Sequence, residues 1–78
     1  MDPVVLELWL RSVVRAAAVE YGVADANVEP GGVRFVPGLV HVIIAGTRSK
    51  RPIRMEMTYT TGPEDSDTLT RVGNCVIL

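Results

Sequence analysis

Basic side chains gather in one short stretch of the chain, the segment GTRSKRPIR at 46–54. This stretch holds four of the eight basic residues of the sequence, Arg48, Lys50, Arg51 and Arg54. Guanidinium and ammonium groups at this spacing can contact phosphate or carboxylate groups. The segment also lies between two apolar runs that read as strands, and basic residues at hairpin loops discourage edge-to-edge aggregation. The simplest interpretation is therefore a solvated hairpin loop, and anion contact is the functional alternative.

The rest of the sequence weighs against nucleic-acid binding as the main function. The net charge is −1 and the isoelectric point is near 5.7, so no overall field attracts DNA or RNA. Proteins that read single strands stack bases on exposed aromatic rings. Here the aromatic residues stand apart from the basic stretch, at Trp9, Tyr21, Phe35 and Tyr59. A nucleic-acid-binding module that uses the basic hairpin 46–54, extended by Arg34 or Arg71, remains the second interpretation.

A second charged stretch is acidic, the segment GPEDSD at 62–67, with Glu64, Asp65 and Asp67. Its carboxylates could hold Ca²⁺ or Mg²⁺, but it lacks the 12-residue arrangement of an EF-hand, so we expect a solvated loop. The run 52–60 separates the two charged segments by about 30 Å if it is a strand. The domain would then carry opposite charges at its two ends. Such a dipole favours head-to-tail or two-fold antiparallel self-association that weakens as salt rises.

Nucleophilic chemistry has one candidate pair, Cys75 and His41, the only cysteine and the only histidine. Both fall in strand-like runs, where a buried thiol and a half-buried, hydrogen-bonded imidazole are the common outcomes. No third catalytic group accompanies them, so we predict no enzyme activity, no cofactor and no metal site. The ending CVIL has the spacing of a prenylation signal, but "LTRVGNCVIL" (69–78) reads better as an ordered final strand that can pair with a partner.

One helix is predicted at the start of the chain. Asp2 and Pro3 form a helix-start signature, and no Gly or Pro follows until Gly22, so the helix should span 3–21. Its apolar arc covers about 200°, whereas a surface helix usually shows a little over 100°. We therefore expect part of this arc to form an interface with a partner, with these residues as contributors: Leu6, Trp9, Leu10, Val13 and Ala17.

The remainder of the chain predicts strands. The segment 23–32 carries turn residues with at most one short strand near 27–29, and the strand-like runs are 33–36, 39–45, 52–60 and 69–78. Clean alternation in 52–60 places Ile53, Met55, Met57 and Tyr59 on a buried face, as in antiparallel sheets. The predicted fold is α+β: one N-terminal helix packed on a three- to four-stranded antiparallel sheet, in the order α-β-β-β-β.

The size of the chain bears on its partners. Seventy-eight residues make a single domain, 1–78, and a domain this small has a thin margin of stability. One cysteine cannot form an internal disulfide, which raises the expectation of oligomerisation. We see no apolar run near the ~20 residues of a membrane span and no export signal, so we expect no membrane contact and a cytoplasmic location. The sequence thus predicts a small non-enzymatic protein–protein interaction domain, a homodimer or a subunit of a larger assembly.

Overall fold

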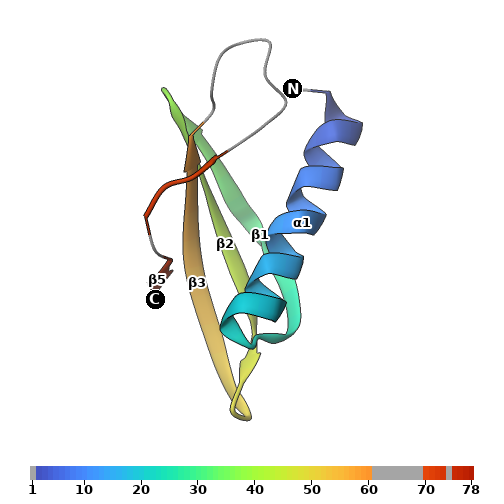
Figure 1. Cartoon of the computed structure of the whole chain (residues 1–78), viewed down its shortest axis with the longest axis vertical. Helices are drawn as coiled ribbons and strands as arrows, with labels where there is room; N and C mark the ends of the chain where they lie inside the picture. The colour runs from blue at the N-terminus through green and yellow to red at the C-terminus, as the bar shows by residue number, and fades with distance from the viewer. Residues whose placement is uncertain (1, 61–69, 74) are drawn as a thin grey trace.

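The computed structural model describes residues 2–60, 70–73 and 75–78, and shows one helix laid against one antiparallel sheet (Figure 1). The strands neighbour one another in chain order, β1-β2-β3-β4, and β5 pairs with β3 beside β4. The predicted α+β fold and its order α-β-β-β-β are confirmed. The elements are α1 (Pro3–Tyr21), β1 (Ala24–Val36), β2 (Leu39–Arg48), β3 (Arg51–Thr60), β4 (Thr70–Arg71) and β5 (Val76–Ile77).

The helix begins and ends where its cap residues predict. The Asp2 carboxylate accepts a hydrogen bond from the Val4 N–H at 2.8 Å, which satisfies a first-turn donor that has no partner within the helix. Pro3 follows in the first turn, where its missing N–H costs nothing. Gly22 ends the helix in the left-handed conformation with φ 67°, and its N–H donates to the Ala17 carbonyl.

The segment after the helix differs from the prediction. Residues 23–32 were expected to form turns around a short strand, but they continue into β1, which pairs with β2 across two irregularities in register. Gly32 makes the second irregularity possible, because a Cβ there would lie 2.7 Å from the Glu29 carbonyl oxygen. Pro30 is tolerated because β1 is an edge strand. Glycine and proline here mark bulges in a strand, and the sequence alone does not distinguish bulges from turns.

The C-terminal run also differs from the prediction of one strand over 69–78. Two short pieces pair with different parts of the outer edge of β3: β4 opposite Tyr59 and Thr60, and β5 opposite Met55 and Glu56. Gly73 lies between them with φ 65°, a conformation that interrupts a strand. The C-terminal segment therefore covers the β3 edge in two places, while β1 is the opposite edge of the sheet.

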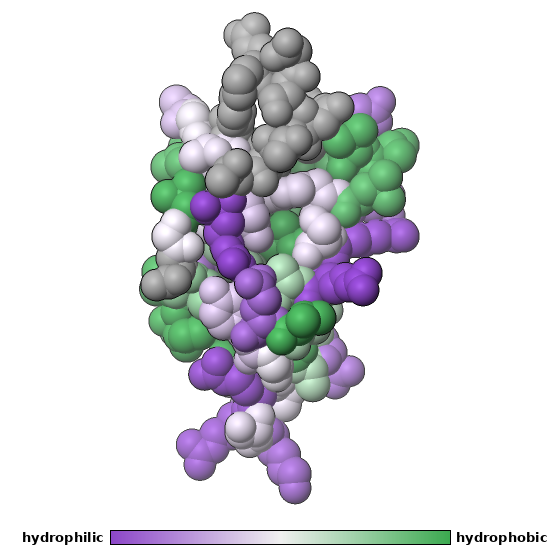
Figure 2. Space-filling view, viewed as in Figure 1, coloured by the Kyte–Doolittle hydropathy of each residue, from purple (hydrophilic) through white to green (hydrophobic). Residues whose placement is uncertain are grey.

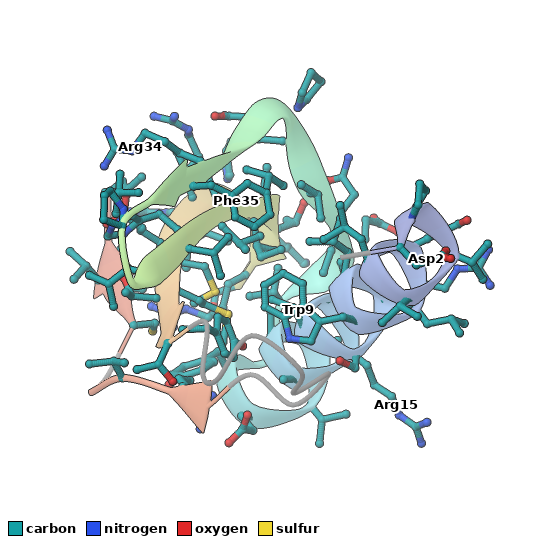
Figure 3. The ribbon with its side chains drawn as sticks, turned by 90° about the horizontal axis from the view of Figure 1, so that it is seen from above. Asp2, Trp9, Arg15, Arg34 and Phe35 are labelled. Carbon is teal, nitrogen blue, oxygen red and sulfur yellow. The ribbon has the colours of Figure 1, made fainter. Side chains whose placement is uncertain are left out.

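The core lies between α1 and one face of the sheet. Alternating residues of β2 and β3 fill it, together with Val13 and Ala17 of the helix and Val23. Trp9 packs edge-to-face on Tyr59, with ring centroids 5.0 Å apart, and Figure 3 shows Trp9 between helix and sheet. The sheet residues in the core are Val40, Val42, Ile44, Met55, Met57 and Tyr59. In the described part of the chain, no helix has the length and apolar character to cross a membrane.

Candidate functional site: a cationic hairpin tip and the surfaces around it

The basic segment forms the turn between β2 and β3, as the sequence predicts. Ser49 and Lys50 are its two central residues, and both have positive φ, 52° and 64°. Positive φ at both positions defines a type I′ turn, which matches the twist of the flanking strands and usually contains Asn-Gly. Residues with side chains pay about 1–2 kcal/mol for this conformation. The hairpin tip is therefore a well-defined but strained turn that projects from one end of the molecule (Figure 1).

The charges of this hairpin tip have no ion-pair partner among the residues that the structure describes. Arg48 and Arg51 lie directly opposite each other in the ladder, and like charges in that arrangement repel. Both side chains and that of Lys50 are exposed, and within the described ranges none of the three forms an ion pair. We call these three residues, Arg48, Lys50 and Arg51, the cationic tip; hydrophilic residues project at this end of the surface in Figure 2.

Arg54, the fourth predicted basic contact, is already paired. Its guanidinium donates two hydrogen bonds to the Glu29 carboxylate of β1, at 2.7 and 2.8 Å. This contact lowers the pKa of Glu29 and raises that of Arg54. Two parallel hydrogen bonds of this kind orient both side chains, so Arg54 ties β3 to the edge strand instead of extending the cationic tip.

Arg71 and Arg34, the predicted extensions of the basic patch, lie elsewhere. Arg71 stands on the helix side of the sheet and donates two hydrogen bonds to Glu20 of α1, at 2.8 and 2.9 Å. This pair lowers the pKa of Glu20 and anchors β4 to the helix. Arg34 is exposed on β1 opposite His41, far along the ladder from the hairpin turn, and Figure 3 shows it pointing away from the helix.

A groove adjoins the cationic tip, and sequence reasoning did not anticipate it. Its volume is about 320 Å³, and it combines two arginines with apolar side chains. It exists because β5 pairs alongside β3 and places Ile77 near Ile53, an arrangement supported by the Leu78 N–H, which donates to the Arg54 carbonyl at 2.9 Å. We call this the tip groove; its lining residues are Arg48, Ser49, Arg51, Pro52, Ile53 and Ile77.

Packing buries some of the helix residues that were predicted to form an interface and leaves others exposed. Val13 and Ala17 are 2% and 0% exposed, so they belong to the core and leave no surface for a partner. Trp9 and Leu10 pack partly against the same core, and Leu6 is half-buried. The helix exposes other large apolar residues, which lie on its outer side: Val4, Leu8 and Val19. An interface on α1 remains a prediction, but its exposed members are these three.

A second groove lies between the helix and the edge strand β1. Its volume is about 340 Å³, and it has a mixed apolar and charged lining. Figure 1 shows α1 running along the β1 side of the sheet, so this groove follows the open edge. The lining residues are Glu7, Leu10, Arg11, Val14, Ala26, Asn27 and Val28. Within it, Arg11 donates to Glu7 at 3.0 Å, one helical turn away.

The sheet separates the two residues of the conceivable Cys–His dyad. His41 lies on the face away from the helix, with Nδ1 3.1 Å from the Thr58 hydroxyl and 3.6 Å from the Glu56 carboxylate. Cys75 packs against the core on the helix side, where its hydrogen bond raises the pKa of Tyr21. A thiol and an imidazole on opposite faces cannot exchange a proton. Among the described residues, no three metal-ligating side chains cluster. The acidic segment 62–67 lies outside the described residues.

No protein-family model, curated protein or solved structure matches the chain. The candidate surfaces therefore rest on this chain's own residues: a cationic tip with its groove, an exposed apolar C-terminal segment, the outer side of α1, and a groove along β1.

Proposed function

We propose that this domain is a non-enzymatic protein–protein interaction module that self-associates or joins a larger assembly. The observation that carries the proposal is its exposed apolar surface. Among the described residues, eight large apolar side chains are 43–75% exposed, whereas the buried core numbers nine residues. The exposed set is Val4, Leu8, Val19, Phe35, Val72, Val76, Ile77 and Leu78.

The distribution of these side chains supports an interface more than their number does. Single exposed apolar residues are common, but groups of them mark contact sites. Here four belong to the C-terminal segment and three to the outer side of α1. Figure 2 shows apolar surface on both sides of the molecule, consistent with these two locations. A domain with so small a core also gains stability from association.

The location of this module is part of the proposal. Its single cysteine is a free thiol that packs against the core. Reduced cysteines are the rule in the cytosol, so a cytoplasmic location fits the domain.

Light scattering after size-exclusion chromatography tests the proposal directly. We expect a mass above that of the 8.5 kDa chain at high micromolar concentration. Leu8→Glu and Val76→Glu then identify the surface, because each places a charge on one apolar group without touching the core. Arg34→Glu is the control, since it changes the charge of an exposed residue of β1 that belongs to neither apolar group. A monomer at every concentration would contradict the proposal.

A second candidate function is contact with nucleic acid through the cationic tip. Its three exposed cations, which form no ion pair with another described residue, favour it. However, Arg54 is neutralised by Glu29, and the exposed aromatic residue Phe35 lies opposite Val40, toward the other end of β2. Fluorescence anisotropy with labelled single and double strands at low salt tests this function. Binding that disappears in Lys50→Glu but survives in Arg15→Glu would support it, and no binding to wild type would end it.

A further inference from the structure

We propose that the tip groove binds the acidic segment 62–67 of a second copy of this chain. The inference rests on the proposed self-association and names the two surfaces that would meet. It assigns a role to the strained hairpin tip, whose cations form no ion pair with another described residue.

The first argument is the contrast among the arginines of the sheet. Arg54 and Arg71 each form two hydrogen bonds with a carboxylate of the same chain. Arg48 and Arg51 face each other across the ladder and line a groove, yet have no carboxylate partner in the described part of the chain. A carboxylate placed between them would relieve their repulsion and form charge-assisted hydrogen bonds.

The second argument is the chemistry of the groove lining. Beside its two arginines the groove presents Pro52, Ile53 and Ile77, so it suits a short polypeptide segment better than a bare ion or a phosphate backbone. The sequence of the segment 62–67 is acidic, with three carboxylates and no basic residue. Its charge therefore complements the three cations of the tip.

The third argument is the distance between the segment and the tip of its own chain, which requires the segment to come from another molecule. The tip lies at the start of β3, and β3 rises about 30 Å from Arg51 to Thr60. The nine residues 61–69 join Thr60 to Thr70, which are paired neighbours at the far end of β3. A chain of that length with both ends together extends at most about 17 Å, half its contour. The segment therefore falls short of the tip of its own chain.

The proposed contact has a defined symmetry. In a two-fold antiparallel dimer, the tip groove of each copy meets the acidic segment of the other, so the contact forms twice. In an open head-to-tail arrangement, two copies share one contact and a free groove remains at one end, so further copies can add. A mass that stops at two chains as concentration rises indicates the two-fold dimer, a mass that keeps growing indicates the head-to-tail form, and either one satisfies the proposal.

A charge-swap experiment tests the pairing. One variant reverses the groove, Arg48→Glu with Arg51→Glu, and the other reverses the segment, Glu64→Lys with Asp65→Lys. We expect each variant alone to self-associate at least about tenfold more weakly than wild type, because like charges then meet at the contact. An equal mixture should regain association, since each groove finds a complementary segment on the other variant. Sedimentation velocity measures all three samples, and circular dichroism confirms their folding.

The control is Arg34→Glu, which reverses the charge of an exposed arginine of β1 that lies away from the groove and points away from the helix in Figure 3. It should associate like wild type. If the groove variant fails to fold, Arg48→Gln with Arg51→Gln replaces it. This variant removes the two positive charges without reversing them, and it should also self-associate more weakly than wild type. Self-association that neither variant weakens, or a mixture that does not recover, overturns this inference and leaves the proposed function standing. A monomeric wild type refutes the proposed function itself.

Discussion

The β2–β3 turn makes a direct prediction about stability, because its backbone is suited to residues that the sequence does not place there. Lys50 has φ 64° in the second central position of a type I′ turn, where glycine is preferred. Replacing Lys50 with glycine should relieve the steric cost of a Cβ in the left-handed region. We therefore expect Lys50→Gly to be more stable than wild type, although it removes a side chain.

The size of the effect follows from two opposing contributions. A side chain in the left-handed region costs about 1–2 kcal/mol. Glycine adds about 0.4–1 kcal/mol of conformational entropy to the unfolded state, which offsets part of the gain. The net increase in the free energy of unfolding should therefore be about 0.5–1 kcal/mol. For a domain of this size, that corresponds to a rise in Tm of about 2–8 °C.

Urea unfolding followed by circular dichroism measures this change, with the m-value required to stay constant. Lys50→Ala is the matched control, because it removes the same charge but keeps a Cβ at positive φ. The free energy of unfolding of the glycine variant should exceed that of the alanine variant by the net backbone contribution of about 0.5–1 kcal/mol. If the two variants are equally stable, charge repulsion at the tip, and not backbone strain, determines the stability of the turn, and the reasoning fails.

Three further predictions follow from the core, a close backbone contact and the carboxylate pairs. Met57→Ala should lower the free energy of unfolding by about 2–5 kcal/mol, because the side chain is fully buried and a cavity would remain; urea unfolding measures this loss. Gly46→Ala should cost about 1–3 kcal/mol by the same assay, since a Cβ there would lie 2.6 Å from a backbone oxygen of β1; wild-type stability would contradict the close contact. The depressed pKa values of Glu20 and Glu29 contribute stability above their ordinary value of 4.5, which is lost as pH falls through the folded-state values. Glu29→Gln should therefore lose less stability than wild type in a melting series from about pH 5 to pH 3, and an identical pH profile would show that the Arg54 pair contributes nothing.

Much of the fold could be predicted from local patterns in the sequence. The Asp2-Pro3 start and the Gly22 stop fix α1, because capping depends on residues adjacent in the chain. The alternation of β3 identified its buried face for the same reason. The segment 23–32 escaped prediction, because a bulge at Gly31-Gly32 and a turn have the same composition, and only pairing with β2 distinguishes them.

The candidate site was predictable in part. The basic residues 48, 50 and 51 were identified from their charge and from their place between two strands. That Arg54 is neutralised could not be inferred, because Glu29 is 25 residues away and meets it only across the sheet. The tip groove could not be predicted from the sequence either, since it forms only because β5 lies beside β3. The helix arc was too wide to indicate which residues are covered.

The sequence by itself determined the helix, the two central strands and the charges at the turn between them, because caps, alternation and turn residues act over a few neighbouring positions. The tertiary structure decided which of these features remain available. It buried Val13 and Ala17, paired Arg54 and Arg71 with distant carboxylates, and separated Cys75 from His41 by a sheet. These outcomes depend on contacts between residues far apart in the chain. The hairpin that first suggested anion binding therefore has three cations without an ion pair in the described part of the chain, and a groove beside them.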